Sequence, residues 1–224
     1  MKVYIVGGDA MIERMFLSRG WDIAEGLTDA DLVCFTGGSD VSPSLYGEAN
    51  VASNCDWQRD VYEMSVWKDA SAMCSQCPIG SEGCGEYDLC CKGDCWEPLP
   101  MVGICRGGQF LNVMNGGKMW QDVNKHGIWG THDINANYDH YQVTSTHHQM
   151  MIAAPEGEVI GTSFLADHFY GDPNHPKEKP NFDTEIVWYS STRTLCFQPH
   201  PEYNGKEDDT EELFFDLLKQ YLGM

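Results

Sequence analysis

The sequence has few basic residues and no long apolar run. Lysine and arginine together number 14 against 34 acidic residues, which leaves a formal charge of −20 over 224 residues. Nucleic-acid phosphates and anionic membrane surfaces repel so acidic a chain, and we expect neither as a partner. No stretch reaches the roughly eighteen consecutive apolar residues of a membrane-spanning helix, and the N-terminal apolar run is too short for a signal peptide. We therefore expect a cytoplasmic protein.

Apolar runs that alternate with helical patterns predict an α/β fold. Residues 2–6 and 31–35 are expected strands, and residues 10–19 between them carry apolar side chains at helical spacing. This order implies parallel pairing with right-handed crossovers, and it places ligand sites at the carboxyl ends of the strands. The length fits a single domain over residues 1–224, built on an open, mostly parallel sheet with helices on both faces.

The rest of the chain adds further helices and strands. The spacing predicts a helix over 59–70, and an amphipathic closing helix after a capping box formed by Asp209 and Glu212. Strands are expected at residues 118–120, 141–144, 158–165, 183–191 and 194–198. Residues 121–140 are polar and irregular, so we predict no element there. We give no role to the scattered histidines of this stretch, because such residues are more often hydrogen-bonded than ligating: His126, His132 and His140.

The stretch around Cys105 predicts a nucleophile. Residues 101–104 form a short apolar run typical of a buried strand, and the apolar residues after Cys105 are spaced for one side of a helix. Gly103, Gly107 and Gly108 permit a sharp turn in which backbone packs on backbone, the geometry that presents a nucleophile at a sheet edge. A helix N-terminus beside the sulfur favours thiolate over thiol. The alternative is a buried structural cysteine in an ordinary strand–helix unit.

A histidine and a carboxylate follow the strand expected at 194–198. Pro199 and Pro201 restrict the backbone on both sides of His200, so we expect an extended segment from which His200 and Glu202 project on one side. A carboxylate that orients a histidine base serves a cysteine nucleophile, and this chain order is the one expected for acyl transfer on an α/β sheet. Without a nucleophile, the same residues would indicate only a polar turn.

Two further motifs follow predicted strands. Gly37 and Gly38 follow the strand at 31–35 and indicate either a simple turn or a backbone N–H donor for a developing oxyanion. His147 and His148 follow the strand at 141–144. Because side chains alternate along an extended chain, only one of these two histidines faces any given site.

Six cysteines lie among glycine, proline and polar residues in an inserted segment at about 74–97. The segment has too little apolar content to order itself. A Cys-x-x-Cys pair followed by further cysteines has the spacing of a thiolate zinc site, and we expect structural zinc there. An iron–sulfur cluster, disulfides and unligated cysteines are the other interpretations. The expected ligands are Cys74, Cys77, Cys90 and Cys95, with Cys84 and Cys91 as alternatives.

Taken together, these motifs resemble the class I glutamine amidotransferase superfamily, and most closely its peptidase C26 branch, which includes the γ-glutamyl-γ-aminobutyrate hydrolases. The matching stretches run from residue 37 to residue 202, and the Cys-rich segment departs from the family pattern. They are Gly37-Gly38-x-Asp40-x-x-Pro43-x-x-Tyr46-Gly47-Glu48, Arg59-Asp60-x-x-Glu63, Gly103-Ile104-Cys105-Arg106-Gly107-x-Gln109, Ser145-x-His147-His148-Gln149 and His200-Pro201-Glu202.

The resemblance implies a flavodoxin-like sheet and a thioester mechanism without a catalytic cofactor. Cys105 would attack a γ-glutamyl carbonyl and water would release glutamate, with His200 as general base and acid and Glu202 as its orienter. The backbone N–H groups of Gly38 and Arg106 would form the oxyanion hole. The substrate-binding residues it implies are Gln109, His147 and His148.

Three functions remain open from the sequence. The first is a glutaminase that hydrolyses glutamine and passes ammonia to a separate synthetase or ligase. The second is a free-standing hydrolase of γ-glutamyl amides or peptides. The third is a catalytically idle binding or scaffold protein, against which the intact Cys105, His200 and Glu202 argue. We prefer the first.

Overall fold

The computed structural model describes residues 1–73, 97–203 and 208–224. Its centre is a nine-stranded sheet with the strand order β2-β1-β3-β4-β13-β12-β10-β7-β8. The cysteines of the predicted zinc site lie outside the described residues: Cys74, Cys77, Cys84, Cys90, Cys91 and Cys95. The zinc site therefore stays a prediction.

The large sheet has a parallel half and an antiparallel half. The parallel half contains β2 (Asp22–Ile23), β1 (Lys2–Val6), β3 (Leu32–Phe35), β4 (Met101–Ile104) and β13 (Thr194–Phe197). The antiparallel half adds β12 (Asp183–Tyr189), β10 (Glu158–Ser163), β7 (Gly130–Ala136) and β8 (Asp139–Ser145). Two small antiparallel pairs lie beside it, β5 (Lys118–Trp120) with β9 (Met150–Ile152) and β6 (Asp122–Val123) with β11 (Phe169–Tyr170).

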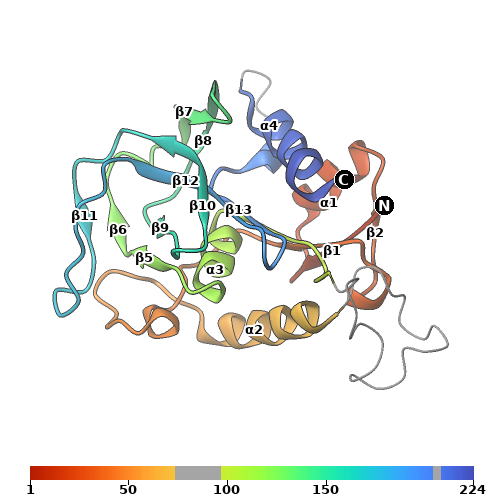
Figure 1. The fold of residues 1–224 in the computed structure, drawn as a ribbon, viewed down its shortest axis with the longest axis horizontal. Helices are drawn as coiled ribbons and strands as arrows, with labels where there is room; N and C mark the ends of the chain where they lie inside the picture. The colour runs from red at the N-terminus through yellow and green to blue at the C-terminus, as the bar shows by residue number, and fades with distance from the viewer. Residues whose placement is uncertain (74–96, 204–207) are drawn as a thin grey trace.

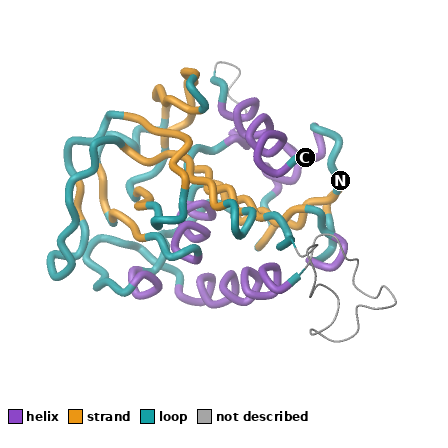
Figure 2. The backbone as a smooth tube through the Cα atoms, in the orientation of Figure 1, coloured by secondary structure: helices purple, strands orange, loops and turns teal. Residues whose placement is uncertain are grey.

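Helices cover both faces of this sheet, with the strands between them (Figures 1 and 2). On one face, α1 (Ala10–Ser18) and α4 (Thr210–Leu217) share an apolar core with β1, β3 and β4. On the other face, α2 (Trp57–Ala72) and α3 (Arg106–Met114) form the second core. The predicted α/β sheet with helices on both faces is confirmed. Short helical turns complete the chain, at Leu27–Asp29, Pro43–Tyr46, Pro201–Tyr203 and Leu218–Leu222.

The register of the parallel strands brings three loops to one sheet edge. Phe197 on β13 pairs with Ile104 on β4, and Phe35 on β3 pairs with Gly103 on β4. The segments that follow these three strands therefore leave the sheet side by side, as expected at the carboxyl ends of parallel strands. Every residue of β3, β4 and β13 is buried, which explains why their sequences are continuous apolar runs rather than alternating patterns.

The expectation of no element over 121–140 was wrong. This stretch contains β6, the whole of β7 and the start of β8, and residues 131–136 alternate between exposed and buried side chains. The turn that joins β7 to β8 consists of Asn137 and Tyr138, which have φ values of 51° and 71°. Positive φ at both positions suits a two-residue hairpin turn. Tyr138 conceals the turn in the sequence, because glycine usually occupies that position.

The predicted capping box at the closing helix was also wrong. The Asp209 side chain makes no capping hydrogen bond, and its Oδ2 instead accepts one from the backbone N–H of Gln142 at 2.9 Å. The oxygen that accepts from the N–H of Thr210 belongs to Asp208, at 3.0 Å. Asp209 thus joins the helix start to strand β8, a tertiary contact that a local motif does not reveal.

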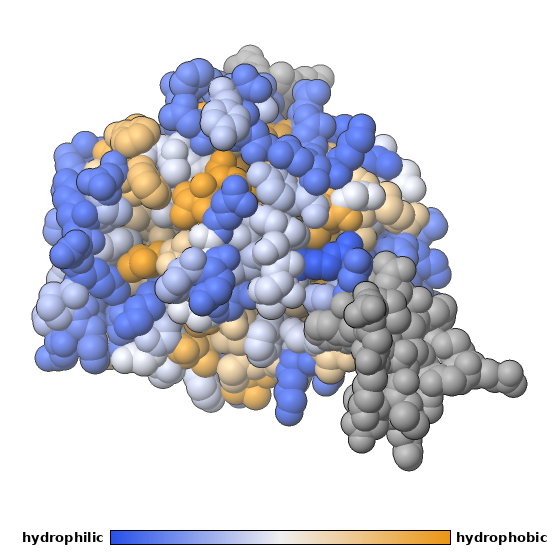
Figure 3. Space-filling model, viewed as in Figure 1, coloured by the Kyte–Doolittle hydropathy of each residue, from blue (hydrophilic) through white to orange (hydrophobic). Residues whose placement is uncertain are grey.

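Among the described residues, no helix combines the length and the apolar character needed to span a bilayer. The face shown in Figure 3 carries many hydrophilic residues, between which hydrophobic residues form smaller patches. This surface agrees with the acidic composition of the chain.

Candidate active site

Cys105 lies on a strained turn between β4 and α3. Its φ and ψ are 50° and −112°, a conformation that residues with a side chain rarely adopt. The turn is tight because the helix packs directly on the sheet: a Cβ on Gly107 would lie 2.1 Å from the carbonyl oxygen of Phe35. A glycine is therefore required there, and the predicted strand, turn and helix are all present.

His200 and Glu202 come together at the end of β13. The Nδ1 atom of His200 lies 2.6 Å from Glu202 Oε1, and both side chains are buried. The segment is not extended as predicted, because Pro201 begins a 3₁₀ turn over Pro201–Tyr203, a first-turn position that proline tolerates. Thr144 on β8, which the sequence did not indicate, accepts a hydrogen bond from the His200 backbone N–H at 2.7 Å.

The imidazole of His200 interacts with the sulfur of Cys105. Burial by itself lowers the pKa of His200, but the charge and hydrogen bond of Cys105, followed by those of Glu202, outweigh burial and raise it to about 10. Because Glu202 occupies Nδ1, the other ring nitrogen is available to the sulfur. With a pKa of about 10, the His200 imidazole is protonated at neutral pH.

The Gly37-Gly38 loop after β3 lies against this pair. A Cβ on Gly37 would be 2.9 Å from His200 Cε1 and 3.8 Å from Cys105 Cβ. Gly38 has a φ of +139°, and a Cβ there would overlap the guanidinium of Arg59. The backbone of this loop thus lies so close to its neighbours that a side chain would not fit at either position. Only glycine permits such an approach.

A buried charge network holds the loop and the elbow together. The Arg106 guanidinium pairs with the carboxylates of Asp60 and Glu63 on α2, and its Nε donates to the carbonyl oxygen of Ser39 at 3.1 Å. Arg59 pairs with Glu63 at 2.7 Å and donates to the carbonyl oxygen of Thr36 at 2.9 Å. Burial, with a smaller effect from Arg59, lowers the pKa of Arg106 to about 10, so Arg106 stays charged at neutral pH.

Comparisons with known proteins show which proteins this chain resembles. The Peptidase C26 family model matches residues 91–170, which include Cys105. The glutamine amidotransferase-like protein YvdE of Lactococcus lactis is 29% identical over 219 residues, covering 88% of this chain and 76% of its own. A glutamine amidotransferase structure from Thermotoga maritima superimposes with a TM-score of 0.57 at 14% identity, covering 100% of this chain and 84% of that one. A GMP synthase component from Thermoplasma acidophilum gives a TM-score of 0.60 at 12% identity, covering 100% and 94%.

Together, these similarities support the class I glutamine amidotransferase superfamily as the group that this chain resembles. The central sheet with its flanking helices shares its overall fold with these structural neighbours.

Two further predicted residues, Gln109 and His148, lie near the same sheet edge. The buried amide of Gln109 donates to the carbonyl oxygen of Gln149 at 3.3 Å and to Gln198 Oε1 at 3.1 Å. His148 is half-buried between two carboxylates, with Nε2 3.0 Å from Asp40 Oδ1 and Nδ1 3.2 Å from Asp122 Oδ1. Its hydrogen bond with Asp40 is the main reason that its pKa is raised to about 9.

His147, the other histidine of this pair, faces away from His148 and toward Glu185. Its ring is buried, its Nδ1 donates to the carbonyl oxygen of Gln149 at 2.8 Å, and its Nε2 lies 3.7 Å from Glu185 Oε2. Because the His147 ring is buried, whereas that of His148 is partly exposed, we propose only His148 as a substrate contact. The sequence had grouped it with His148, but the alternation that separates the two side chains turns this one toward a second cluster of histidines.

Proposed function

We propose that this chain is a cysteine amidohydrolase that cleaves a γ-glutamyl amide through a thioester on Cys105. One observation carries the proposal: a strained cysteine at a helix N-terminus lies beside His200, whose Nδ1 is held by Glu202 at 2.6 Å. A nucleophile, a base and a group that orients the base are the three parts that acyl transfer requires.

In the first half of the reaction, the Cys105 sulfur attacks the amide carbonyl carbon. The carbonyl oxygen takes up the electron pair and becomes an oxyanion. When the C–N bond breaks, protonated His200 gives its proton to the leaving nitrogen, and a thioester and a free amine or ammonia result. In the second half, His200 removes a proton from water, the hydroxide attacks the thioester, and glutamate and the Cys105 sulfur are released.

The backbone N–H groups of Gly38 and Arg106 are the proposed oxyanion donors. Loss of one such donor costs roughly 3 kcal/mol of transition-state stabilisation. The side chain of Arg106 supports this assignment, because its bond to the Ser39 carbonyl oxygen joins the loop that carries one donor to the elbow that carries the other. We further propose Gln109 and His148 as residues that hold the glutamyl group.

We propose glutamine as the first substrate, with ammonia passed to a separate synthetase. The fold similarity to a GMP synthase component supports a partner of this kind. A free-standing hydrolase of γ-glutamyl amides or peptides is the second candidate, and the Peptidase C26 match favours it. The described cysteines, Cys34, Cys55, Cys105 and Cys196, are free thiols, which fits a cytoplasmic location.

Replacement of the nucleophile tests the chemistry. We expect Cys105→Ser to lower hydrolysis of glutamine and γ-glutamyl amides by on the order of 10³-fold or more while the chain stays folded. Cys55→Ser, which alters another free thiol outside the elbow, should keep full activity. A glutamine-analogue electrophile should add one mass equivalent to the wild type and none to Cys105→Ser. Hydrolysis by Cys105→Ser within tenfold of the wild type would contradict the proposal.

A further inference from the structure

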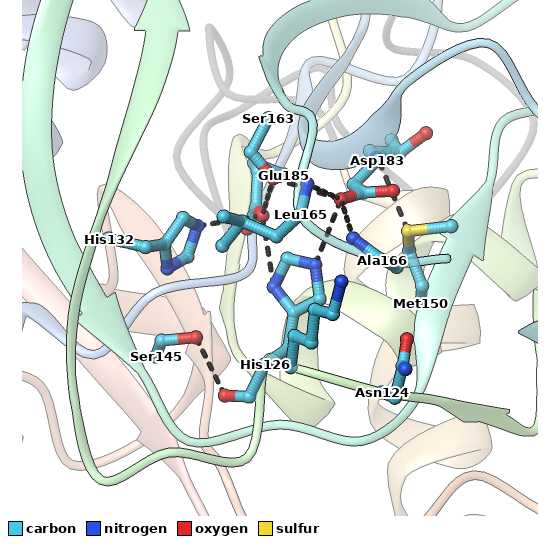
Figure 4. A network of polar contacts seen from close by, with 12 residues as sticks. Asn124, His126, His132, Ser145, Met150, Ser163, Leu165, Ala166, Asp183 and Glu185 are labelled. Atoms are coloured by element: carbon cyan, nitrogen blue, oxygen red, sulfur yellow. Dashed lines mark hydrogen bonds and ion pairs between the residues drawn. The ribbon is translucent and has the colours of Figure 1, made fainter. Parts of the chain in front are cut away.

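Three buried histidines surround one carboxylate in the antiparallel half of the sheet. Glu185 lies on β12, His132 on β7, and His126 and His147 follow β6 and β8. Glu185 Oε1 is 2.9 Å from His132 Nε2 and 3.5 Å from His126 Nδ1, and Glu185 Oε2 is 3.7 Å from His147 Nε2. Figure 4 shows the rings of His126 and His132 directed at Glu185 from different elements. We call these four residues the His–Glu cluster.

His126 and His147 each make a hydrogen bond through the ring nitrogen that points away from Glu185. These bonds indicate which ring nitrogen carries the proton. His147 Nδ1 faces the carbonyl oxygen of Gln149 at 2.8 Å, and a carbonyl only accepts, so this nitrogen carries the proton. His126 Nε2 lies 3.1 Å from Asp183 Oδ2, which also accepts from the backbone N–H groups of Leu165 and Ala166 at 2.6 and 2.8 Å. Asp183 is therefore an acceptor, and His126 Nε2 is the donor.

When His126 and His147 are neutral, the second nitrogen of each ring has no proton and directs its lone pair at Glu185. His126 Nδ1, His147 Nε2 and Glu185 Oε2 are buried and make no hydrogen bond. Buried acceptors without hydrogen bonds destabilise the folded protein, because nothing replaces their lost hydration. Acceptors that face one another also repel each other. A cation between them would satisfy all three.

We propose that the His–Glu cluster binds one divalent transition metal ion of the zinc type. Ligand atoms of His126, His132 and Glu185 all lie within 4.8 Å of one another, and His147 Nε2 supplies the fourth donor. Tetrahedral zinc holds such ligands at about 2.0–2.2 Å, which places neighbouring ligand atoms roughly 3.4 Å apart. The separations of 3.5 and 3.7 Å to Glu185 are close to that value. On binding, His132 would exchange its 2.9 Å contact with Glu185 for a bond from Nε2 to the metal, as the neutral tautomer with its proton on Nδ1.

The surroundings resemble the outer shell of a metal site. Ligating histidines usually donate their second ring N–H to a carboxylate or a backbone carbonyl, as His126 does to Asp183 and His147 does to Gln149. With four protein donors and no open position, the site is structural rather than catalytic. The site joins segments around β6, β7, β8 and β12. The carbonyl oxygen of Gln149, which contacts His147, also accepts a hydrogen bond from Gln109. Through this contact the ion would stabilise one wall of the proposed active site.

Metal analysis of the full chain tests the proposal, and it must separate this site from the thiolate zinc predicted in the Cys-rich segment. A variant with all six of those cysteines changed to serine should keep about one equivalent of zinc after growth with zinc. Its Co²⁺ form should show ligand-field bands without thiolate charge-transfer bands. Adding His132→Gln should remove that equivalent, whereas His140→Gln, at an exposed histidine outside the His–Glu cluster, should retain it. Asp183→Asn should weaken zinc binding by about 10- to 100-fold.

X-ray absorption of the wild-type chain identifies the zinc ligands without the serine variant, and it therefore tests the proposal even if that variant does not fold. We expect a nitrogen and oxygen shell at about 2.0–2.1 Å, which is distinct from sulfur at about 2.3 Å, and we expect His132→Gln to diminish it. Added zinc should also raise the melting temperature of metal-free wild type more than that of His132→Gln. A wild-type spectrum with sulfur ligands alone, or metal content unchanged by His132→Gln, would overturn the proposal. None of these readouts depends on hydrolysis.

Discussion

The guanidinium of Arg106 donates from Nε to the carbonyl oxygen of Ser39, 3.1 Å away. This bond joins the residue after Cys105 to the loop after β3, two segments separated by 67 positions in the chain. The same guanidinium is neutralised by Asp60 and Glu63 on α2. One buried side chain therefore sets the distance between the two proposed oxyanion donors.

Arg106→Lys should reduce both activity and stability. Lysine keeps the charge, but a single ammonium group cannot reproduce the planar contacts to Asp60, Glu63 and Ser39. We expect kcat to fall by about 10²-fold with a smaller change in KM, because the oxyanion donors would lose their alignment. Disruption of the buried ion pairs should lower the free energy of unfolding by about 3 kcal/mol. Steady-state kinetics and denaturant titration measure the two effects.

Arg19→Lys is the matched control for that change. Arg19 pairs with Glu211 at 2.7 Å near the surface, where such pairs contribute little. We expect its free energy of unfolding to change by less than about 0.5 kcal/mol and its kcat to stay at the wild-type value. Equal losses in Arg19→Lys and Arg106→Lys would contradict a positioning role for Arg106.

Gly37→Ala should impair catalysis without unfolding the protein. The added methyl group would lie 2.9 Å from His200 Cε1, so the imidazole must shift away from Cys105. A displacement of this kind at the reacting groups typically lowers kcat by about 10²-fold. The control is Gly26→Ala, where an added Cβ meets no atom within 4 Å. Wild-type kcat in Gly37→Ala would show that the loop does not constrain His200.

The titration of His200 should depend on Cys105. The pKa of His200 is raised to about 10 although burial opposes this, and the charge and hydrogen bond of Cys105 are the largest causes of the increase. Because the folded pKa exceeds the ordinary value of about 6.5, the stabilisation from this pair is complete below pH 6.5 and is lost as the pH rises through 10.

NMR titration of the imidazole measures that dependence. Cys105→Ser removes the negative partner, so we expect the pKa of His200 to fall by more than one unit toward its ordinary value. Glu202 is still present in this variant, so the smaller part of the increase in the His200 pKa that Glu202 causes should remain. An unchanged His200 pKa in Cys105→Ser would mean that no thiolate–imidazolium pair exists.

A side-by-side assay separates the two enzyme functions. A glutaminase that supplies a synthetase should hydrolyse glutamine slowly by itself, and its rate should rise when the partner binds. We therefore expect weak glutaminase activity from the isolated chain. Rapid turnover of a γ-glutamyl amine by the pure protein, on the order of 10 per second, with glutamine left intact, would instead establish a free-standing hydrolase.

The sequence by itself determined the local features of this protein. The apolar run before Cys105 and the glycines after it predict the elbow, because backbone can pack on backbone there only without side chains. The order of strands and helices predicts the parallel sheet, and with it the meeting of Gly37, Cys105 and His200 at one edge. These inferences need only the local pattern of apolar residues and glycines in the sequence and the known geometry of parallel strands.

Only the tertiary structure decided the contacts between distant segments. Glu185 lies 53 positions after His132, in a sequence whose polar pattern concealed β7, and the antiparallel sheet brings Glu185 to His126 and His132. The fold likewise turns His147 toward Glu185 while His148 faces Asp40, and it redirects Asp209 from a helix cap to Gln142. Burial is the physical reason, because a polar group enclosed by the fold must find its partner among whichever residues packing places beside it.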